Sequence, residues 1–303
     1  MIAARGGGTS SLFQNPGESM QEVAYINGTF CDLKDAKVSI EDRGFQFADG
    51  VYEVIVAPRG RPFRLREHLQ RLERSTDAIS LAVDYSALDL PAVIHDGVNR
   101  SGFEDAMVYL QITRGVVPRD HLYPEDAAPT VVATFKAKPV YERGLRERGV
   151  ALETVCDIRW ERCSVKSIAL LPNVMLKNAA RRRGRFDAII LGSDEIVRET
   201  TCANVFMISG GHLRTPPADE HILHGVTRAY IFECARDLGV PCEEHAFKAA
   251  DMVAADEVFV SSTTIDIMPV ATIDDRSIGT GRAGKLTLRL LERFYQGMAD
   301  GGD

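Results

Sequence analysis

The sequence lacks any apolar run near the length of about 20 residues that a membrane-spanning helix requires. Its six cysteines are scattered and include no CxxC pair and no His/Cys cluster at zinc spacing. This pattern argues against a metal site and indicates a reduced, cytoplasmic protein with small buried thiols. Charge is not gathered into tails either, because the net charge of −7 is spread along the chain. We therefore expect no membrane span, no metal and no nucleic-acid partner.

The first twenty residues also have little to bury, since they are rich in glycine and serine. Arginine is too scarce there for a typical transit peptide, and the apolar centre of a signal peptide is missing. We expect residues 1–20 to form a disordered leader, with Met20 as a second plausible start.

What the sequence does contain is an alternation of strand and helix patterns. Asn-Gly between apolar residues at 25–30 is a strong hairpin signal, and the leucine spacing at 64–80 predicts an amphipathic helix. Because most strands are joined as hairpins, we expect an α/β (α+β) fold with mixed or antiparallel sheets. The other expected elements are strands at 51–65 (strand, turn, strand), 107–117, 130–137 and 149–160, hairpins at 186–200, 204–215 and 257–274, and helices at 90–102, 172–183, 224–239 and 285–299.

A chain of 303 residues is long enough for two domains. The best candidate for a linker is the segment 137–141, which contains Pro139. We predict a small N-terminal α/β domain at 21–136 and a larger C-terminal domain at 142–303. Ligand sites commonly form between domains, so we expect the functional site in the cleft between these two.

Two segments offer hydrogen-bond donors for an anion. Gly-Val-Thr at 225–227 begins a predicted helix, where free N–H groups and the helix dipole favour negative charge; simple N-capping by Thr227 is the alternative. Ser-Ser-Thr-Thr at 261–264 lies at a strand end, where an ordinary Ser/Thr turn is the alternative. The G-x-G-x-x-G pattern at 279–284 precedes only one helix, so we interpret it as a loop rather than a dinucleotide fingerprint.

Several other polar residues have two interpretations. Arg71 lies on the polar side of its predicted helix, where a solvated charge is the ordinary interpretation. Tyr52 belongs to a strand and can face either side of it. The loop at 113–121 brings together Arg114, Arg119 and His121, which suits recognition of a carboxylate. Taken separately, these residues leave both a functional and a structural role open.

Two lysines are candidates for covalent chemistry. A lysine that forms a Schiff base must be partly desolvated, so that its pKa falls and some of it is neutral. Lys166 follows an extended segment and precedes the apolar run 168–171, which places it at a buried strand end. Lys177 lies within a predicted helix, four residues before Arg181 on the same face, where a solvated charge is expected. These features favour Lys166.

A series of segments in a fixed order gives the chain a resemblance to a known family. They are EDRGFQFADGVYEV (41–54), EHLQRL (67–72), QITRGVVPRDH (111–121), DIRWERCSVKSIALL (157–171), HGVTR (224–228) and VSSTT (260–264). With these motifs the chain resembles the class IV, fold type IV aminotransferases that use pyridoxal 5′-phosphate. Within that family it is most similar to the bacterial D-amino acid (D-alanine) aminotransferases. The resemblance extends from about Ala24 to Phe294.

The resemblance implies a role for each matched residue. The lysine that forms the Schiff base matches Lys166, whereas Lys177 matches a lysine without a catalytic part. The glutamate that pairs with the pyridine nitrogen matches Glu199, and a leucine that packs against the ring matches Leu223. The residues that bind the cofactor phosphate match Arg71, Val226, Thr227 and Thr263. The residues that hold the substrate carboxylate match Tyr52, Arg119 and His121, the last two reaching across from the partner subunit of a homodimer.

The sequence departs from the family pattern just after Glu199. Thr200 replaces a glycine whose backbone freedom the family can use, and Cys202 and Ala203 replace hydroxyl donors. Ala169 stands where an asparagine is usual. We expect these changes to affect substrate range and turnover more than cofactor binding.

The function that the resemblance implies is transamination of a D-amino acid, of the D-alanine or D-glutamate type, with a 2-oxo acid as acceptor. A branched-chain or R-selective amine transaminase is one alternative, which would share the cofactor residues but not Arg119 and His121. A lyase of the aminodeoxychorismate type is another. From a different class, the changed segment 200–203 would suit a cofactor-binding protein that no longer turns over.

Overall fold

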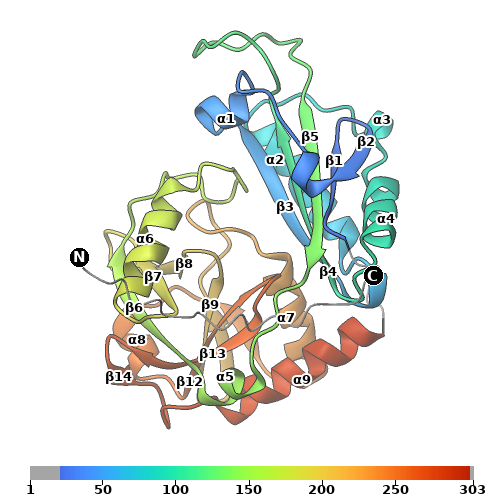
Figure 1. Ribbon diagram of the computed structural model, residues 1–303. Helices are drawn as coiled ribbons and strands as arrows, with labels where there is room; N and C mark the ends of the chain where they lie inside the picture. The colour runs from blue at the N-terminus through green and yellow to red at the C-terminus, as the bar shows by residue number, and fades with distance from the viewer. Residues whose placement is uncertain (1–20, 301–303) are drawn as a thin grey trace, which may run out of the picture.

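The computed structural model describes residues 21–300, so the expected leader at 1–20 lies outside the described residues. Within this range the chain forms a five-stranded and a nine-stranded β-sheet, with helices packed on both. Figure 1 shows the two sheets in separate lobes, the first drawn in blue to green and the second in yellow to red. The chain passes from one sheet to the other between Ala137 and Val150, and the predicted linker at 137–141 falls in this stretch. The expected mixed α/β fold is confirmed.

The first sheet is antiparallel throughout and has the strand order β2-β1-β5-β4-β3. The hairpin expected at 25–30 is present, and Asn27 (φ 44°) and Gly28 (φ 95°) both adopt the positive φ that its two-residue turn requires. The strands are β1 (Val23–Ile26), β2 (Thr29–Asp32), β3 (Gly50–Ala57), β4 (Ala106–Thr113) and β5 (Thr130–Ala137).

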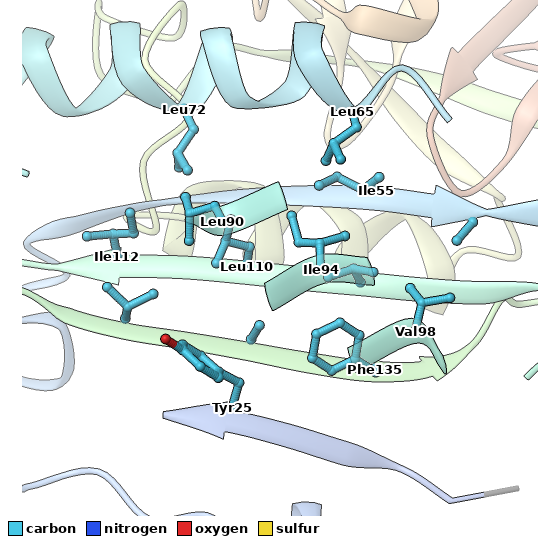
Figure 2. Packing of buried hydrophobic residues seen from close by; sticks show 14 of the residues in the cluster. Tyr25, Ile55, Leu65, Leu72, Leu90, Ile94, Val98, Leu110, Ile112 and Phe135 are labelled. Atoms are coloured by element: carbon cyan, nitrogen blue, oxygen red, sulfur yellow. The ribbon is translucent and has the colours of Figure 1, made fainter. Parts of the chain in front are cut away.

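Helices α2 (Leu65–Ala78) and α4 (Leu90–Ser101) bury their apolar sides against this sheet. Figure 2 shows Leu65 and Leu72 of α2 pointing toward the strands, above Leu110. The short helices α1 (Arg43–Phe47) and α3 (Tyr85–Leu88) lie in the connections before β3 and before α4. The leucine spacing therefore identified the correct side of α2, and this packing fixes the helix against β3.

The second sheet is mixed, with the order β11-β10-β9-β12-β13-β6-β7-β8 and β14 paired to β13. β6 is parallel to both β13 and β7, and β10 is parallel to β11; the remaining pairs are antiparallel. The strands are β6 (Val150–Cys156), β7 (Asp187–Leu191), β8 (Val197–Thr200), β9 (Asn204–Ser209), β10 (His212–Thr215), β11 (Cys242–Glu244), β12 (Glu257–Ser262), β13 (Asp266–Ile273) and β14 (Arg276–Ser277).

The helices of the second lobe cover this sheet. α7 (Val226–Asp237) and α9 (Lys285–Ala299) pack against each other and against β12, and α6 (Leu171–Arg182) lies against β6 and β7. The short helices are α5 (Arg143–Arg148), against β13, and α8 (Ala249–Val253). The glycine-rich segment 279–284 is the loop that leads into α9, as expected.

The strand, turn, strand pattern expected at 51–65 is wrong in its second half. β3 ends at Ala57 and is followed by the 3-10 turn η2 (Pro58–Gly60), after which α2 begins at Leu65. Pro62 has no N–H group for a ladder, and Arg64 adopts a left-handed conformation (φ 56°) that ends any extended run. The short connection brings α2 back over β3.

Candidate active site

A pocket lies where the first sheet meets the second, and it encloses about 810 Å³ of empty space with its open mouth included. β3 and α2 contribute Tyr52 and Arg71, and the other lining residues all come from residue 159 onward. Eight of the ten predicted site residues line this pocket: Tyr52, Arg71, Lys166, Glu199, Leu223, Val226, Thr227 and Thr263.

The segment that carries Lys166 is attached to strand β3. The Tyr52 N–H donates to the Lys166 carbonyl at 3.0 Å, and the Ile168 N–H donates to the Gly50 carbonyl at 3.1 Å. Val51 and Ser167 form an isolated β-bridge between these two bonds. A residue of the second lobe is thereby held in register with a strand of the first.

The Lys166 amine faces the ring of Tyr52, with Nζ 4.3 Å from the ring centroid. Burial lowers the pKa of Lys166 to about 8, helped by the Arg71 guanidinium and opposed by the carboxylates of Glu53 and Glu199. About a tenth of this amine is therefore neutral at pH 7, far more than for an ordinary lysine, and a nucleophilic lysine requires a neutral form. Tyr52 itself stacks on Tyr109, with the ring centroids 5.5 Å apart, so its side chain is fixed toward the pocket.

Lys177 has a different environment from the one expected. Its Nζ lies 2.7 Å from Asp187 Oδ2 and 5.0 Å from the centroid of the Phe186 ring, so it is ion-paired rather than simply solvated. Asp187 is buried at the start of β7, which makes this pair part of the packing of α6. Lys177 does not line the pocket, in agreement with the absence of a catalytic role.

Arg71 is buried, and the interpretation of it as a solvated charge is wrong. Its Nε and Nη2 each lie 2.7 Å from an oxygen of Glu53, and Nη1 donates to the His224 carbonyl at 3.1 Å. His68 Nδ1 completes the cluster, 2.7 Å from Glu53 Oε2. Burial alone would raise the pKa of Glu53, but the charges and hydrogen bonds of Arg71 and His68 hold it well below its usual range. Arg71 is thus a fixed cation at the pocket wall.

The N-terminus of α7 opens onto the same pocket. Gly225 is its N-cap, and no side chain caps the helix, so the expected alternative of N-capping by Thr227 does not apply. A Cβ on Gly225 would lie 2.2 Å from Asn204 Oδ1, so this position has no room for a side chain. Nearby, the Ser261 hydroxyl is buried, lines the pocket and has no hydrogen-bond partner among the described residues. These free donors, together with Arg71, suit a phosphate.

Glu199 is a buried carboxylate with three donors. Arg159 Nη1 lies 2.5 Å from Oε1, while the Leu223 N–H at 3.2 Å and Asn204 Nδ2 at 3.4 Å share Oε2. Burial raises the pKa of Glu199 above its usual value, and the Arg159 guanidinium opposes that shift. A carboxylate held in this way suits a ligand with an N–H group.

The changed segment after Glu199 forms a tight turn without backbone strain. The Thr200 N–H donates to the Ala203 carbonyl at 2.7 Å, and Thr200 is not among the non-glycine residues of 21–300 that adopt positive φ. Thr201 Oγ1 donates to Asp187 Oδ1 at 2.6 Å. The special freedom of a glycine is therefore not needed at position 200. Cys202 lines the pocket, where its side chain is exposed.

Arg119 and His121 do not line this pocket. They lie in the loop between β4 and β5, where both stack near Phe47: the Arg119 guanidinium is 4.8 Å and the His121 ring 5.7 Å from its centroid. Arg114, from the same loop, is buried and bound to Asp49 and to the carbonyls of residues 79 and 80. Arg114 therefore supports the fold, which leaves Arg119 and His121 as the loop's exposed candidates for binding a carboxylate.

The sequence analysis did not identify Glu53, Arg159 or Asn204, which hold the predicted residues in place. Arg159 lies in the motif 157–171, two residues after an aspartate, so an acid–base pair beside the lysine segment was the available signal. Glu53 had no local signal, because its partners are on another element.

Within residues 21–300, no helix is long and apolar enough to cross a membrane. The same residues contain no group of three or more His, Cys, Asp or Glu that could hold a metal ion.

The chain is similar in sequence to known proteins. Residues 50–273 match the family described as amino-transferase class IV. The chain is 40% identical to a D-alanine aminotransferase from Listeria monocytogenes serotype 1/2a (strain 10403S) over 89% of this chain and 94% of the relative. It is 39% identical to a D-alanine aminotransferase from Bacillus licheniformis, over 86% and 92% of the two chains.

Solved structures share the whole arrangement. The branched-chain amino acid aminotransferase of Escherichia coli superimposes with a TM-score of 0.85 and 26% identity, over 91% of this chain and 94% of the other. A branched-chain aminotransferase from the archaeon Thermoproteus uzoniensis gives a TM-score of 0.83 and 28% identity, over 94% and 97%. The two-sheet architecture around the pocket is therefore common to enzymes with different substrates.

Proposed function

Because the chain belongs to the class IV aminotransferases, which use pyridoxal 5′-phosphate, we propose that it moves the amino group of a D-amino acid, such as D-alanine or D-glutamate, onto a 2-oxo acid. One observation carries the proposal: a part-neutral lysine amine lies in a pocket that also holds free donors for a phosphate and a buried carboxylate for a ring nitrogen. The identity of about 40% to D-alanine aminotransferases supports the choice of enantiomer.

The donors of the pocket fit this cofactor. Arg71 and the α7 N-terminus, with Val226 and Thr227, would hold its phosphate together with Thr263, and the partnerless Ser261 hydroxyl is one further donor on that wall. Glu199 would accept the N–H of its ring, and Leu223 would pack against the ring face. When bound, the cofactor supplies an aldehyde carbon and a ring that accepts electrons.

The chemistry of the chain itself centres on the Lys166 amine. With a pKa of about 8, Nζ would attach the cofactor, and once freed by the substrate amine it would take the proton from Cα and deliver it to the former aldehyde carbon. Tyr52 packs beneath Nζ and limits its position. Burial favours the neutral form of this amine, the Arg71 guanidinium adds to that effect, and its partner Glu53 opposes it.

A homodimer is part of the proposal, because the pocket of one chain has no free cation for the substrate carboxylate. Its cations are Lys166 and two arginines; Arg71 would hold the cofactor phosphate, and Arg159 is bound to Asp157 and Glu199. Two groups of apolar residues are exposed. The group near the loop that carries Arg119 and His121 consists of Val38, Ile40, Phe45, Val116 and Leu122. The group near the pocket consists of Ile158, Trp160, Leu171, Val174 and Met175. A second copy that covers both groups would bring Arg119 and His121 to this pocket.

The described cysteines are all free thiols, which supports the proposed reduced, cytoplasmic location.

The proposal is tested by measuring pyruvate formation from D-alanine by the purified protein, with and without 2-oxoglutarate. We expect pyruvate only with the acceptor, and much slower reaction of the L-enantiomer. Turnover of L-valine or L-leucine above that of any D-amino acid would make the protein a branched-chain enzyme instead. D-Alanine cannot give pyruvate catalytically without an acceptor, so the lyase is tested with its own substrate. Pyruvate released from aminodeoxychorismate without acceptor would indicate a lyase, and cofactor binding without turnover a non-catalytic protein.

A further inference from the structure

Arg159 joins two carboxylates in the wall of the pocket. Its Nε and Nη2 bind the two oxygens of Asp157 at 3.0 and 2.9 Å, and its Nη1 binds Glu199 Oε1 at 2.5 Å. Nη2 also donates to the His221 carbonyl at 3.1 Å. Every nitrogen of the guanidinium is therefore used, and the side chain is only 4% exposed.

The geometry divides the guanidinium unequally between the two acids. Asp157 receives a two-nitrogen pair, which is the stronger arrangement, whereas Glu199 receives a single bond. A carboxylate has about four acceptor positions, of which Glu199 uses three for Arg159, Leu223 and Asn204. Since Glu199 lines the pocket, one acceptor position is left for a ligand.

The three side chains together carry two negative charges and one positive charge. An uncompensated buried charge is costly, so this cluster favours a ligand group that brings a positive charge and an N–H donor. A neutral pyridine nitrogen has neither, but a protonated one has both. The cluster is therefore matched to the protonated form of a pyridine ring.

We propose that Asp157 is a positioning residue that keeps Glu199 available as the anionic partner of the protonated ring nitrogen. By holding two nitrogens of Arg159, Asp157 prevents the guanidinium from forming a two-nitrogen pair with Glu199 and neutralising it. This inference rests on the proposed function, because it assumes that the ligand is a pyridoxal or pyridoxamine phosphate.

Most of the other charged groups near the cluster do not offset its excess negative charge. Arg198, on the Asp157 side, is paired with Asp194 at 3.0 Å, and Asp219 is an exposed acid. Burial raises the pKa of Cys163 to about 11, so this thiol is neutral. The Lys166 amine, with a pKa of about 8, is still mostly protonated at pH 7, and its charge opposes this excess from the other side of Glu199.

The test compares two ligands that bind without a covalent bond, pyridoxamine 5′-phosphate and its analogue with carbon in place of the ring nitrogen. Calorimetry with the full-length, cofactor-free protein gives a Kd for each. We expect the Kd of the wild type to be lower for the nitrogen ligand by about tenfold or more. If the cluster raises the pKa of the ring nitrogen by one unit, the protonated ring binds about tenfold more tightly. Asp157→Asn should remove most of that preference, and Glu199→Gln all of it.

Matched measurements separate this role from a structural one. Asp275→Asn breaks an exposed Asp–Arg pair outside the pocket, where both Asp275 oxygens lie 2.8 Å from Arg185 Nη2, and should leave the preference unchanged. The ¹⁵N shift of labelled pyridoxamine 5′-phosphate should show a protonated ring in the wild type and loss of that proton in Asp157→Asn. Equal weakening of both ligands in Asp157→Asn, with the ring still protonated, would overturn the inference. If neither ligand binds the wild type, the proposed function itself fails.

Discussion

At the scale of single residues, the two lysines of the segment 161–184 differ in what surrounds their amines. Lys166 faces Tyr52 across the pocket, whereas Lys177 is paired with Asp187. We predict that Lys166→Ala abolishes borohydride trapping of the cofactor and that Lys177→Ala leaves it intact, because only the first amine lines the pocket. Peptide mapping of the trapped label by mass spectrometry checks this, and a label on Lys177 would contradict it.

The lowered pKa of Lys166 predicts a pH dependence. In the cofactor-free protein, Lys166 should react with small aldehydes through a transition near pH 8, well below the ordinary lysine value of about 10.4. Unfolding restores the ordinary pKa, so between these values the unfolded chain binds more protons and the contribution of Lys166 to stability rises with pH. Urea titrations of wild type and Lys166→Met at pH 8 and 10 measure this. A difference between the two proteins that shrinks at higher pH is expected, and a constant one would exclude the shift.

Arg71 combines ligand binding with folding, because it neutralises the buried Glu53. Removing one partner of a buried ion pair costs about 3–5 kcal/mol, so Arg71→Ala should lower the free energy of unfolding by about that amount as well as weaken cofactor binding. Glu53→Gln in the same protein should restore much of the stability but not the cofactor affinity. Urea denaturation and dialysis against buffer provide the two measurements. Arg66→Ala, at an exposed position of α2, is the control and should change neither.

At the scale of elements, the N-terminus of α7 depends on a glycine. The Cβ of Gly225→Ala would meet Asn204, which binds the Leu223 carbonyl at 3.0 Å and Glu199 at 3.4 Å. We expect this overpacking to cost about 1–3 kcal/mol of stability and to weaken phosphate-bearing ligands more than pyridoxal. Gly144→Ala meets only the ends of the flexible Arg148 and Glu142 side chains and serves as the control. Equal affinity losses for ligands with and without phosphate would contradict the assignment of this terminus.

The same scale shows what could be predicted from sequence. The hairpin at Asn27-Gly28 and the helix α2 follow from turn chemistry and leucine spacing, which are local, and the structure confirms both. The burial of Arg71 was missed because its partner Glu53 lies 18 residues away on β3. Eight of the site residues predicted from the order of the motifs line one pocket, and Arg119 does not. A pattern within one chain cannot show which residues a second chain would contribute.

At the scale of the whole molecule, the proposed dimer makes a complementation experiment possible. Lys166→Ala and Arg119→Ala should each be nearly inactive, but a mixed dimer would contain one site with both native residues. Random mixing makes half of the dimers mixed, each with half of its sites intact, so about a quarter of wild-type activity should return after unfolding and refolding the two together. Recovery near zero would place Arg119 in the same chain's site or outside any site.

The attachment of the lysine segment to β3 also has a mechanical consequence. Because the amides of Tyr52 and Ile168 bind carbonyls of the opposite segment, the lysine and the tyrosine ring are carried by two backbone segments that hydrogen bonds join into one piece. A hinge motion between the lobes would change the distance from this piece to the start of α7 and leave the amine over the ring. Hydrogen exchange at these two amides should therefore be as slow as in the centre of β3, while the entrance to the pocket is free to widen.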